Sequence, residues 1–327
     1  MALRNKVVIC AIVVAQRLQL SPSMKNLLST FVFVGLSSLG LIVNPSFAVG
    51  PNLLSSAVLV LDAQSGEAIY AKNANAVTPI ASITKLMTAM IVLDADQLLD
   101  EKLEIGVDDL DYLKASKSRL GMGTLLTRRE MLQLSLMSSE NRAANALGRY
   151  FPGGSDAAVK AMNAKAKSLG MSNSRFADTT GLSPGNVSTA RDLATLVKTA
   201  NTYPLIAKYS TQSDQYVQID TTGQTLHFNN SNALVKSSGW DISVQKTGFI
   251  REAGRCVVML AQIAQRPVVL VLLDSVGRFS RLGDAHRVKT WMETGEVLAI
   301  PKPKVVKKSK AKRGVKHSNK RVVKRKR

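Results

Sequence analysis

Three short groups of polar residues in this chain could together carry out acyl transfer. They are Ser82-Ile83-Thr84-Lys85, Ser139-Glu140-Asn141 and Lys246-Thr247-Gly248, in that order along the chain. The first pattern, S-x-x-K, carries little weight alone because it recurs at Ser243–Lys246 and Ser309–Lys312. The patterns S-x-N and K-T-G each occur once. The informative signal is therefore the combination of the three motifs in one order.

Ser82 and Lys85 form a candidate pair of nucleophile and base. They are three positions apart at the start of a predicted helix that runs to Leu93, so they share a face of that helix. A serine hydroxyl is a weak nucleophile until a base removes its proton. Lys85 can act as that base only when it is neutral. Burial and a second cation nearby would both lower its pKa, and Lys246 is a candidate for that second cation.

The second motif supplies groups for proton transfer and positioning. Ser139 follows a predicted helix and could relay a proton to a leaving amine. Asn141 could hold both Lys85 and an amide of the substrate through its side-chain amide. Both residues are therefore expected to face Ser82 in the folded chain.

The third motif lies on a predicted strand and could bind the substrate. Lys246 and Thr247 can bind a carboxylate, and Gly248 permits the close approach of a backbone. The backbone N–H groups of Ser82 and Phe249 would form an oxyanion hole. This chemistry needs neither a metal nor a cofactor.

The elements that must position these motifs are grouped by type along the chain. Strand-like runs occur at both ends of the central region, and helical patterns lie between them. This order predicts an α/β sandwich, in which an antiparallel sheet is flanked by helices and residues 101–240 form an inserted, mostly helical part. The predicted strands are 57–61, 68–71, 242–246, 256–263 and 268–273; the predicted helices are 82–93, 129–136, 155–170, 189–197 and 285–294, with caps at Ser155 and at Thr189 with Asp192.

The two ends of the chain differ from its centre in charge. The formal charge is +21 over 327 residues, but 14 of the basic residues lie in 301–327, which contains no acid. We predict that residues 300–327 form a disordered basic tail that binds an anionic envelope surface. The centre is nearly neutral and has no basic cluster, which argues against nucleic acid as a partner.

Residues 1–48 are predicted to be a signal peptide. Met24-Lys25-Asn26 opens a charged start, residues 27–43 are apolar, and Ser46-Phe47-Ala48 fits a cleavage site between small residues. Met24 is a possible true start. This predicts export to the periplasm and leaves a catalytic domain over residues 49–299. Cys256 is then a lone cysteine in an apolar run, which favours a buried hydrophobe over a catalytic thiol.

With the three motifs in place, the chain resembles the low-molecular-mass penicillin-binding proteins, which are serine D-alanyl-D-alanine peptidases. The resemblance runs from about Ala57 to Trp291, and it includes residues 79–81, 176–182, 188–194, 229–232 and 280–291. It implies a β-lactamase/transpeptidase-like fold and an acyl-enzyme on Ser82. It also implies that peptidoglycan stem peptides are the substrates and that β-lactams are covalent inhibitors.

Within this family the chain looks most like a D-alanyl-D-alanine endopeptidase, because Glu140 occupies the middle of S-x-N, where carboxypeptidases usually have a small residue. A carboxypeptidase is the main alternative, and a catalytically inactive wall-binding protein is another. A class A β-lactamase is disfavoured because no Glu lies between Asn141 and Arg251 to activate water. A metallopeptidase is disfavoured because His227, His286 and His317 are far apart in sequence.

Overall fold

The computed structural model describes residues 50–219 and 222–301. Its centre is a five-stranded sheet in the order β2-β1-β11-β10-β9, in which every neighbouring pair is antiparallel. The predicted strands and the α/β class are both confirmed. The strands are β1 (Ser55–Asp62), β2 (Ala68–Lys72), β9 (Asp241–Ile250), β10 (Gly254–Ile263) and β11 (Arg266–Ser275).

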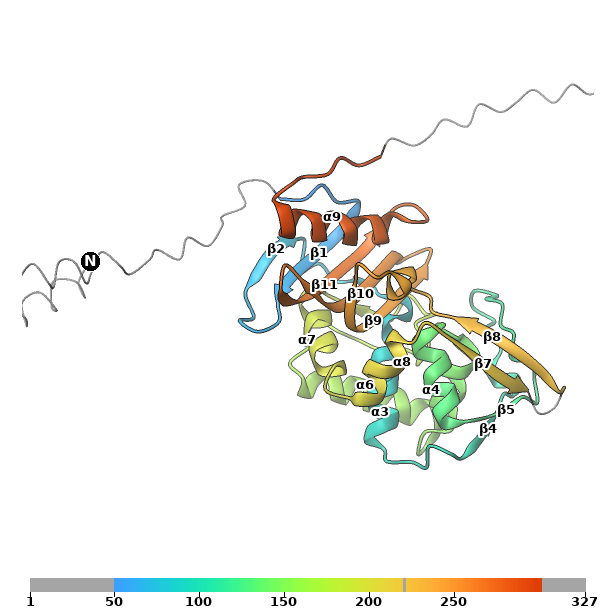
Figure 1. Ribbon diagram of the computed structural model, residues 1–327. Coiled ribbons are helices and arrows are strands. Elements are labelled where there is room, and N and C mark those ends of the chain that lie inside the picture. Colours follow the sequence, from blue (N-terminus) through green and yellow to red (C-terminus); the bar gives the residue numbers. More distant parts are fainter. Residues whose placement is uncertain (1–49, 220–221, 302–327) are drawn as a thin grey trace, which may run out of the picture. The chain divides into compact units, whose positions relative to one another are not determined.

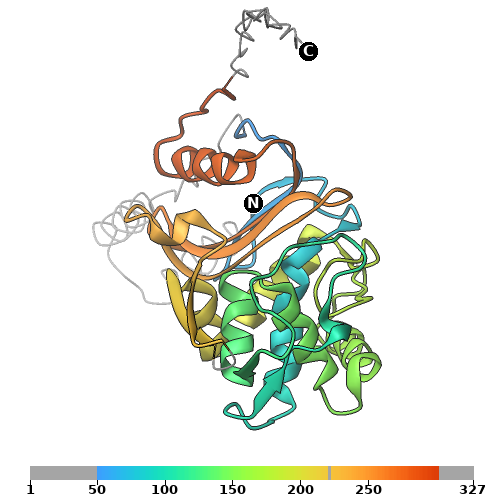
Figure 2. The ribbon, with the colours of Figure 1, turned by 90° about the vertical axis from the view of Figure 1, so that its right-hand side faces the viewer.

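Helices cover the sheet on both sides (Figures 1 and 2). Helix α9 (Ser280–Thr294) packs on one face, and α7 (Ala190–Ala200) packs on the other against β1, β10 and β11. This explains why six consecutive residues are buried in both β10 and β11, since a strand that is covered on both faces has no side left for polar residues. Cys256 on β10 is a free, fully buried thiol, as predicted.

The region between the two ends of the sheet is mostly helical, as predicted, but it also contains short strand pairs. Helix α3 (Thr84–Asp94) is buried along nearly its whole length, and α4, α5, α6 and α8 pack around it. The remaining elements are α4 (Arg128–Met137), α5 (Asn141–Arg149), α6 (Gly154–Ser168), α8 (Pro204–Thr211), the pairs β3 (Thr78–Pro79) with β6 (Val187–Ser188), β4 (Lys102–Glu104) with β5 (Leu125–Thr127) and β7 (Asp214–Ile219) with β8 (Gln224–Asn229), and the 3₁₀ turns η1 (Ala81–Ile83), η2 (Val107–Asp109) and η3 (Ala233–Lys236).

Two of the predicted helix caps differ from the structure. Gly153 at φ +84° is the N-cap of α6, so Ser155 lies inside the first turn and the predicted cap is wrong. Thr189 does cap α7 by accepting from the Asp192 N–H at 3.1 Å. The Asp192 carboxylate, however, accepts from Asn173 N and Ser174 Oγ, because a neighbouring loop packs against it.

The predicted ends of the chain lie outside the described residues. This applies to the signal peptide with Met24 and to the basic tail beyond Pro301. Within the described part of the chain, no helix combines the length and the apolar character that crossing a bilayer requires.

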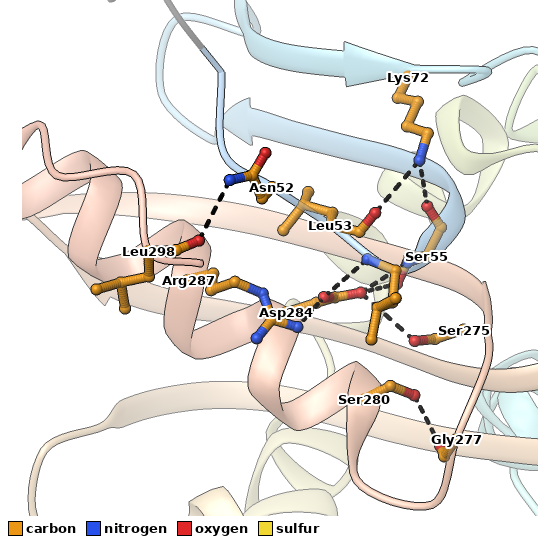
Figure 3. A network of polar contacts seen from close by, with 11 residues as sticks. Asn52, Leu53, Ser55, Lys72, Ser275, Gly277, Ser280, Asp284, Arg287 and Leu298 are labelled. Carbon is orange, nitrogen blue, oxygen red and sulfur yellow. Dashed lines mark hydrogen bonds and ion pairs between the residues drawn. The ribbon is translucent and has the colours of Figure 1, made fainter. Parts of the chain in front are cut away.

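A buried carboxylate joins the first strand to the last helix (Figure 3). Asp284 on α9 is fully buried and accepts from Ser55 N at 2.7 Å, Ser55 Oγ at 2.6 Å and Leu54 N at 3.0 Å. Arg287, one turn further along α9, donates to the same carboxylate. Because these groups are shielded from water, the network fixes the position of α9 on the sheet.

We expect Asp284→Asn to lower the free energy of unfolding by about 3–5 kcal/mol, because it leaves the buried Arg287 without its counter-charge and turns an acceptor into a donor opposite two N–H groups. Urea denaturation would measure the loss. The matched control is Asp100→Asn, which breaks an exposed ion pair with Arg129 and should change stability by less than about 0.5 kcal/mol. Equal effects of the two changes would contradict this account.

Candidate active site

The nucleophile candidate Ser82 lies in a strained turn rather than inside an α-helix. It belongs to η1, which leads directly into α3, and the preceding residue Ala81 has φ +48°. A non-glycine residue in this conformation is held there by its surroundings, and such strain gathers at functional sites. Lys85 follows in the first turn of α3, with its Nζ 2.9 Å from Ser82 Oγ. The two residues therefore meet, as their spacing predicts.

The contacts of Lys85 define how it can act. Its Nζ lies 2.8 Å from Asn141 Oδ1 and 2.6 Å from the Thr180 carbonyl oxygen. Asn141 Nδ2 donates to Ser116 Oγ, so Oδ1 is the atom that faces the amine. A neutral amine has two N–H donors and one lone pair, whereas both of these oxygens can only accept. When Lys85 is neutral, its lone pair is therefore left for the hydroxyl proton of Ser82.

The environment favours that neutral form. Lys85 is fully buried, and burial lowers its pKa to about 7, although the negative charges of Asp178, Glu140 and Asp111 act in the opposite direction. Loss of hydration on burial, one of the two causes expected from the sequence, is the main one. The repulsion between Lys85 and Lys246, the other expected cause, acts on the pKa of Lys246.

Lys246 brings the second and third motifs together. Its Nζ donates to Ser139 Oγ at 2.8 Å and to the Thr247 carbonyl at 2.9 Å, and the whole side chain is buried. Burial, together with repulsion from Lys85 and Arg281, holds the pKa of Lys246 well below its usual value. Ser139 has φ +64° in the connection between α4 and α5, a second strained residue at this site.

The rest of the third motif lines up along β9. An added Cβ at Gly248 would lie 2.9 Å from the Ile80 carbonyl oxygen and 3.2 Å from Ser82 N, so the glycine lets β9 approach the nucleophile turn itself. Thr247 Oγ1 donates to Ser231 Oγ at 2.8 Å. The next residue, Phe249, is half exposed in the cleft.

A loop that sequence reasoning gave no role holds the nucleophile turn in place. The Asp178 carboxylate accepts from the backbone N–H groups of Thr180, Gly181 and Ser183, which turns the Thr180 carbonyl toward Lys85. Gly181 has φ +80°, and a Cβ there would lie only 2.0 Å from the Ala81 carbonyl oxygen. The sequence Asp-Thr-Thr-Gly is typical of such a turn, so the turn itself could have been predicted. The packing of this turn against the Ala81–Ser82 backbone depends on the tertiary fold and could not.

These residues open into one cleft of about 830 Å³, lined by Ser82, Ser139, Asn141, Thr247, Gly248 and Phe249 among others.

Sequence reasoning missed Arg281, which also lines the cleft and comes from α9. Among the described residues no group accepts a hydrogen bond from its buried Nε or Nη1 atoms. Burial, with repulsion from Arg255, lowers the pKa of this guanidinium. A partly buried guanidinium with free donors is suited to binding an anion.

Known proteins are similar to this chain in sequence and in fold. The family model described as D-alanyl-D-alanine carboxypeptidase (peptidase S11) matches residues 45–277. The D-alanyl-D-alanine endopeptidases of Pseudomonas aeruginosa and Escherichia coli are 48% and 46% identical, over 76% and 77% of this chain and 80% and 81% of their own length.

Solved structures agree with the sequence relatives. The Streptomyces K15 DD-transpeptidase superposes with a TM-score of 0.69 at 26% identity, covering 74% of this chain and 98% of its own. Penicillin-binding protein D2 of Listeria monocytogenes, solved in an ampicillin-bound form, superposes with a TM-score of 0.62 at 30% identity and covers 73% and 97%.

The fold and the cleft define a serine hydrolase with a lysine, rather than a histidine, beside the nucleophile candidate. The chain belongs to the D-alanyl-D-alanine carboxypeptidase family of serine peptidases, as its resemblance predicted.

We expect Gly181→Ala to destabilise the protein more than Gly66→Ala does. Both glycines have φ near +80°, at +80° and +76°, so the conformational cost of alanine, about 1–2 kcal/mol, is shared. Only Gly181 adds a collision with Ala81, which should cost about 1–3 kcal/mol more. Urea denaturation of the two variants measures the difference. Equal stability would mean that the loop does not press on the nucleophile turn.

Proposed function

We propose that this protein is a D-alanyl-D-alanine endopeptidase that cleaves D-alanyl cross-links between the stem peptides of peptidoglycan. The observation that carries the proposal is the buried Lys85, whose two acceptor partners leave its lone pair for Ser82. The names of the relatives at 48% and 46% identity support the endopeptidase assignment. A carboxypeptidase is the second candidate because relatives with that name share 28–30% identity over most of the catalytic region.

The proposed reaction begins at Ser82. Neutral Lys85 takes the hydroxyl proton while Ser82 Oγ attacks the D-alanyl carbonyl carbon, and the backbone N–H groups of Ser82 and Phe249 stabilise the oxyanion. Ser139 passes its hydroxyl proton to the leaving amine as the C–N bond breaks, and it takes a replacement proton from Lys246, which donates to it. Water then attacks the ester carbon and gives its proton back to Lys246, while Lys85 returns its proton to the departing Ser82 Oγ.

The same proposal covers inhibitors and location. A β-lactam presents a strained amide to Ser82 and would acylate it, as the ampicillin-bound form of the Listeria relative suggests. We also propose that residues 1–48 direct export to the periplasm, that residues 49–299 form the catalytic domain, and that the basic residues of 300–327 attract an anionic envelope surface.

Digestion of purified cross-linked muropeptide dimers, with products identified by mass, tests the function. The wild type should convert dimers to monomers, and Ser82→Ala should leave them intact. Release of free D-alanine from pentapeptides while the dimers persist would replace the endopeptidase assignment with a carboxypeptidase. Cleavage by Ser82→Ala would contradict the assigned nucleophile.

We expect the rate of acylation by a fluorescent penicillin to rise with pH around a midpoint near the Lys85 pKa of about 7. Lys85 must be neutral to accept a proton, and its neutral fraction is about 10% at pH 6 and about 90% at pH 8. Lys85→Arg keeps the charge but cannot become neutral, so it should be nearly inactive throughout. A rate that is constant from pH 5.5 to 8.5, or an active Lys85→Arg variant, would show that Lys85 is not the base.

Arg281 would bind the carboxylate of the residue whose amine is released, together with Lys246 and Thr247. We expect Arg281→Gln to raise KM about 10- to 100-fold, since a hydrogen bond to a charged group contributes about 1.5–3 kcal/mol. The matched control is a substrate whose terminal carboxylate is replaced by a carboxamide. The variant and the wild type should differ much less on this substrate, and an equal loss on both substrates would contradict the assignment.

A further inference from the structure

One wall of the cleft is a segment without helix or strand, residues 110–119, here called the strap. Asp111 shapes it by accepting from the backbone N–H groups of Leu113, Lys114 and Ser116 at 2.8–2.9 Å. Tyr112, Leu113, Lys114, Ala115 and Ser116 all line the cleft. The strap is therefore built by local polar contacts and faces the same space as Ser82.

The strap is attached to both halves of the domain. Ser116 Oγ accepts from Asn141 on α5, and Arg119 donates to the His227 carbonyl on β8, which ties the strap to the helical part. Lys114 Nζ lies 2.6 Å from Glu252 Oε1 in the turn between β9 and β10. This third contact, here called the clasp, crosses the cleft and ties the strap to the five-stranded sheet.

The clasp lies at the end of the groove that follows β9. This strand is at the edge of the sheet, and an edge strand can pair with an extended peptide. Gly248 lies beside Ser82, and Glu252 is four residues further along the chain, which is at most about 13 Å at 3.3 Å per residue. Glu252 therefore lies at the end of the groove rather than beside Gly248, and it faces a part of the peptide beyond the scissile bond.

The strap also presents apolar side chains that nothing in the described structure covers. Tyr112 is 76% exposed and Leu113 is 68% exposed, although both line the cleft. Exposed large apolar groups beside a binding groove are typical of a contact surface for a ligand. Phe249 lies across the cleft on β9 and is also exposed.

We propose that Lys114 and Glu252 determine specificity for long substrates, an inference that rests on the proposed peptidase function. The clasp holds the strap over the far end of the groove, where Tyr112 and Leu113 contact the acyl-donor peptide beyond the residue that Ser82 attacks. A short substrate does not reach this region. The clasp therefore affects the binding of extended or cross-linked peptides and leaves the chemistry at Ser82 unchanged.

The test compares two peptides that contain the same D-alanyl cross-link. One has a short acetylated acyl-donor peptide, and in the other this donor is extended at its N-terminus to a full stem peptide on a disaccharide. Glu252→Lys places two positive charges opposite each other and should raise KM for the long peptide about fivefold, the range expected for loss of a partly exposed ion pair. KM for the short peptide, kcat for both, and fluorescent penicillin labelling should stay unchanged.

Three further variants sharpen the result. The charge swap Lys114→Glu with Glu252→Lys restores the pair and should restore the long-peptide KM. Tyr112→Ala should raise the same KM with the clasp intact. Asp100→Lys, which opposes Arg129 in an exposed pair outside the cleft lining, is the matched control and should change neither KM.

Each outcome decides the proposal. An unchanged long-peptide KM in Glu252→Lys would overturn it, and so would an equal loss on both peptides, which would mean that the strap positions catalytic groups. Failure of the swap to rescue KM would show that the single charges, rather than the clasp, matter. If the wild type cleaved neither peptide, the proposed function itself would fail, and the inference with it.

Discussion

The site depends on one constraint, which is the burial of the Lys85 amine between two oxygens that can only accept hydrogen bonds. A lysine in water would be charged and would offer Ser82 no lone pair. Here loss of hydration lowers the pKa of Lys85 to about 7. Asn141 Oδ1 and the Thr180 carbonyl oxygen accept hydrogen bonds from the two N–H groups of the neutral amine. The direction of proton transfer therefore follows from which atoms surround the nitrogen.

This arrangement requires three segments that are distant in the chain to meet within one hydrogen bond of each other. Helix α3 supplies Lys85, the start of α5 supplies Asn141, and the loop folded around Asp178 supplies Thr180. Strain at Ala81 and at Ser139 shows that the fold bends the chain to achieve it. The buried core around α3 provides the stability that offsets this strain.

The parts of the site that depend on side-chain type and local spacing could be predicted from the sequence, and the parts that depend on tertiary contact could not. Ser82 and Lys85 are three positions apart where the 3₁₀ turn η1 leads into α3, so their contact follows from local spacing. Thr180 acts through its backbone carbonyl, which any residue possesses, and Arg281 is recognisable only once α9 lies beside the cleft. Burial was expected to lower the Lys85 pKa, but the residues that bury it are a property of the packed fold. The strands followed from their apolar runs, whereas the side chain of Asp192 binds a neighbouring loop in place of the predicted cap contact.

Three basic side chains, Lys85, Lys246 and Arg281, are buried to different degrees beside one cleft, and each has its pKa lowered mainly by loss of hydration. Such an arrangement is costly until an anion arrives, because like charges repel and the free donors of Arg281 lack a partner among the described residues. The Asp284 network holds α9, and with it Arg281, against the sheet one turn away. The fold thus keeps an unsatisfied positive site in place. A substrate carboxylate that enters it gains preformed donors without any rearrangement, and this binding energy is available to hold the scissile carbonyl beside Ser82.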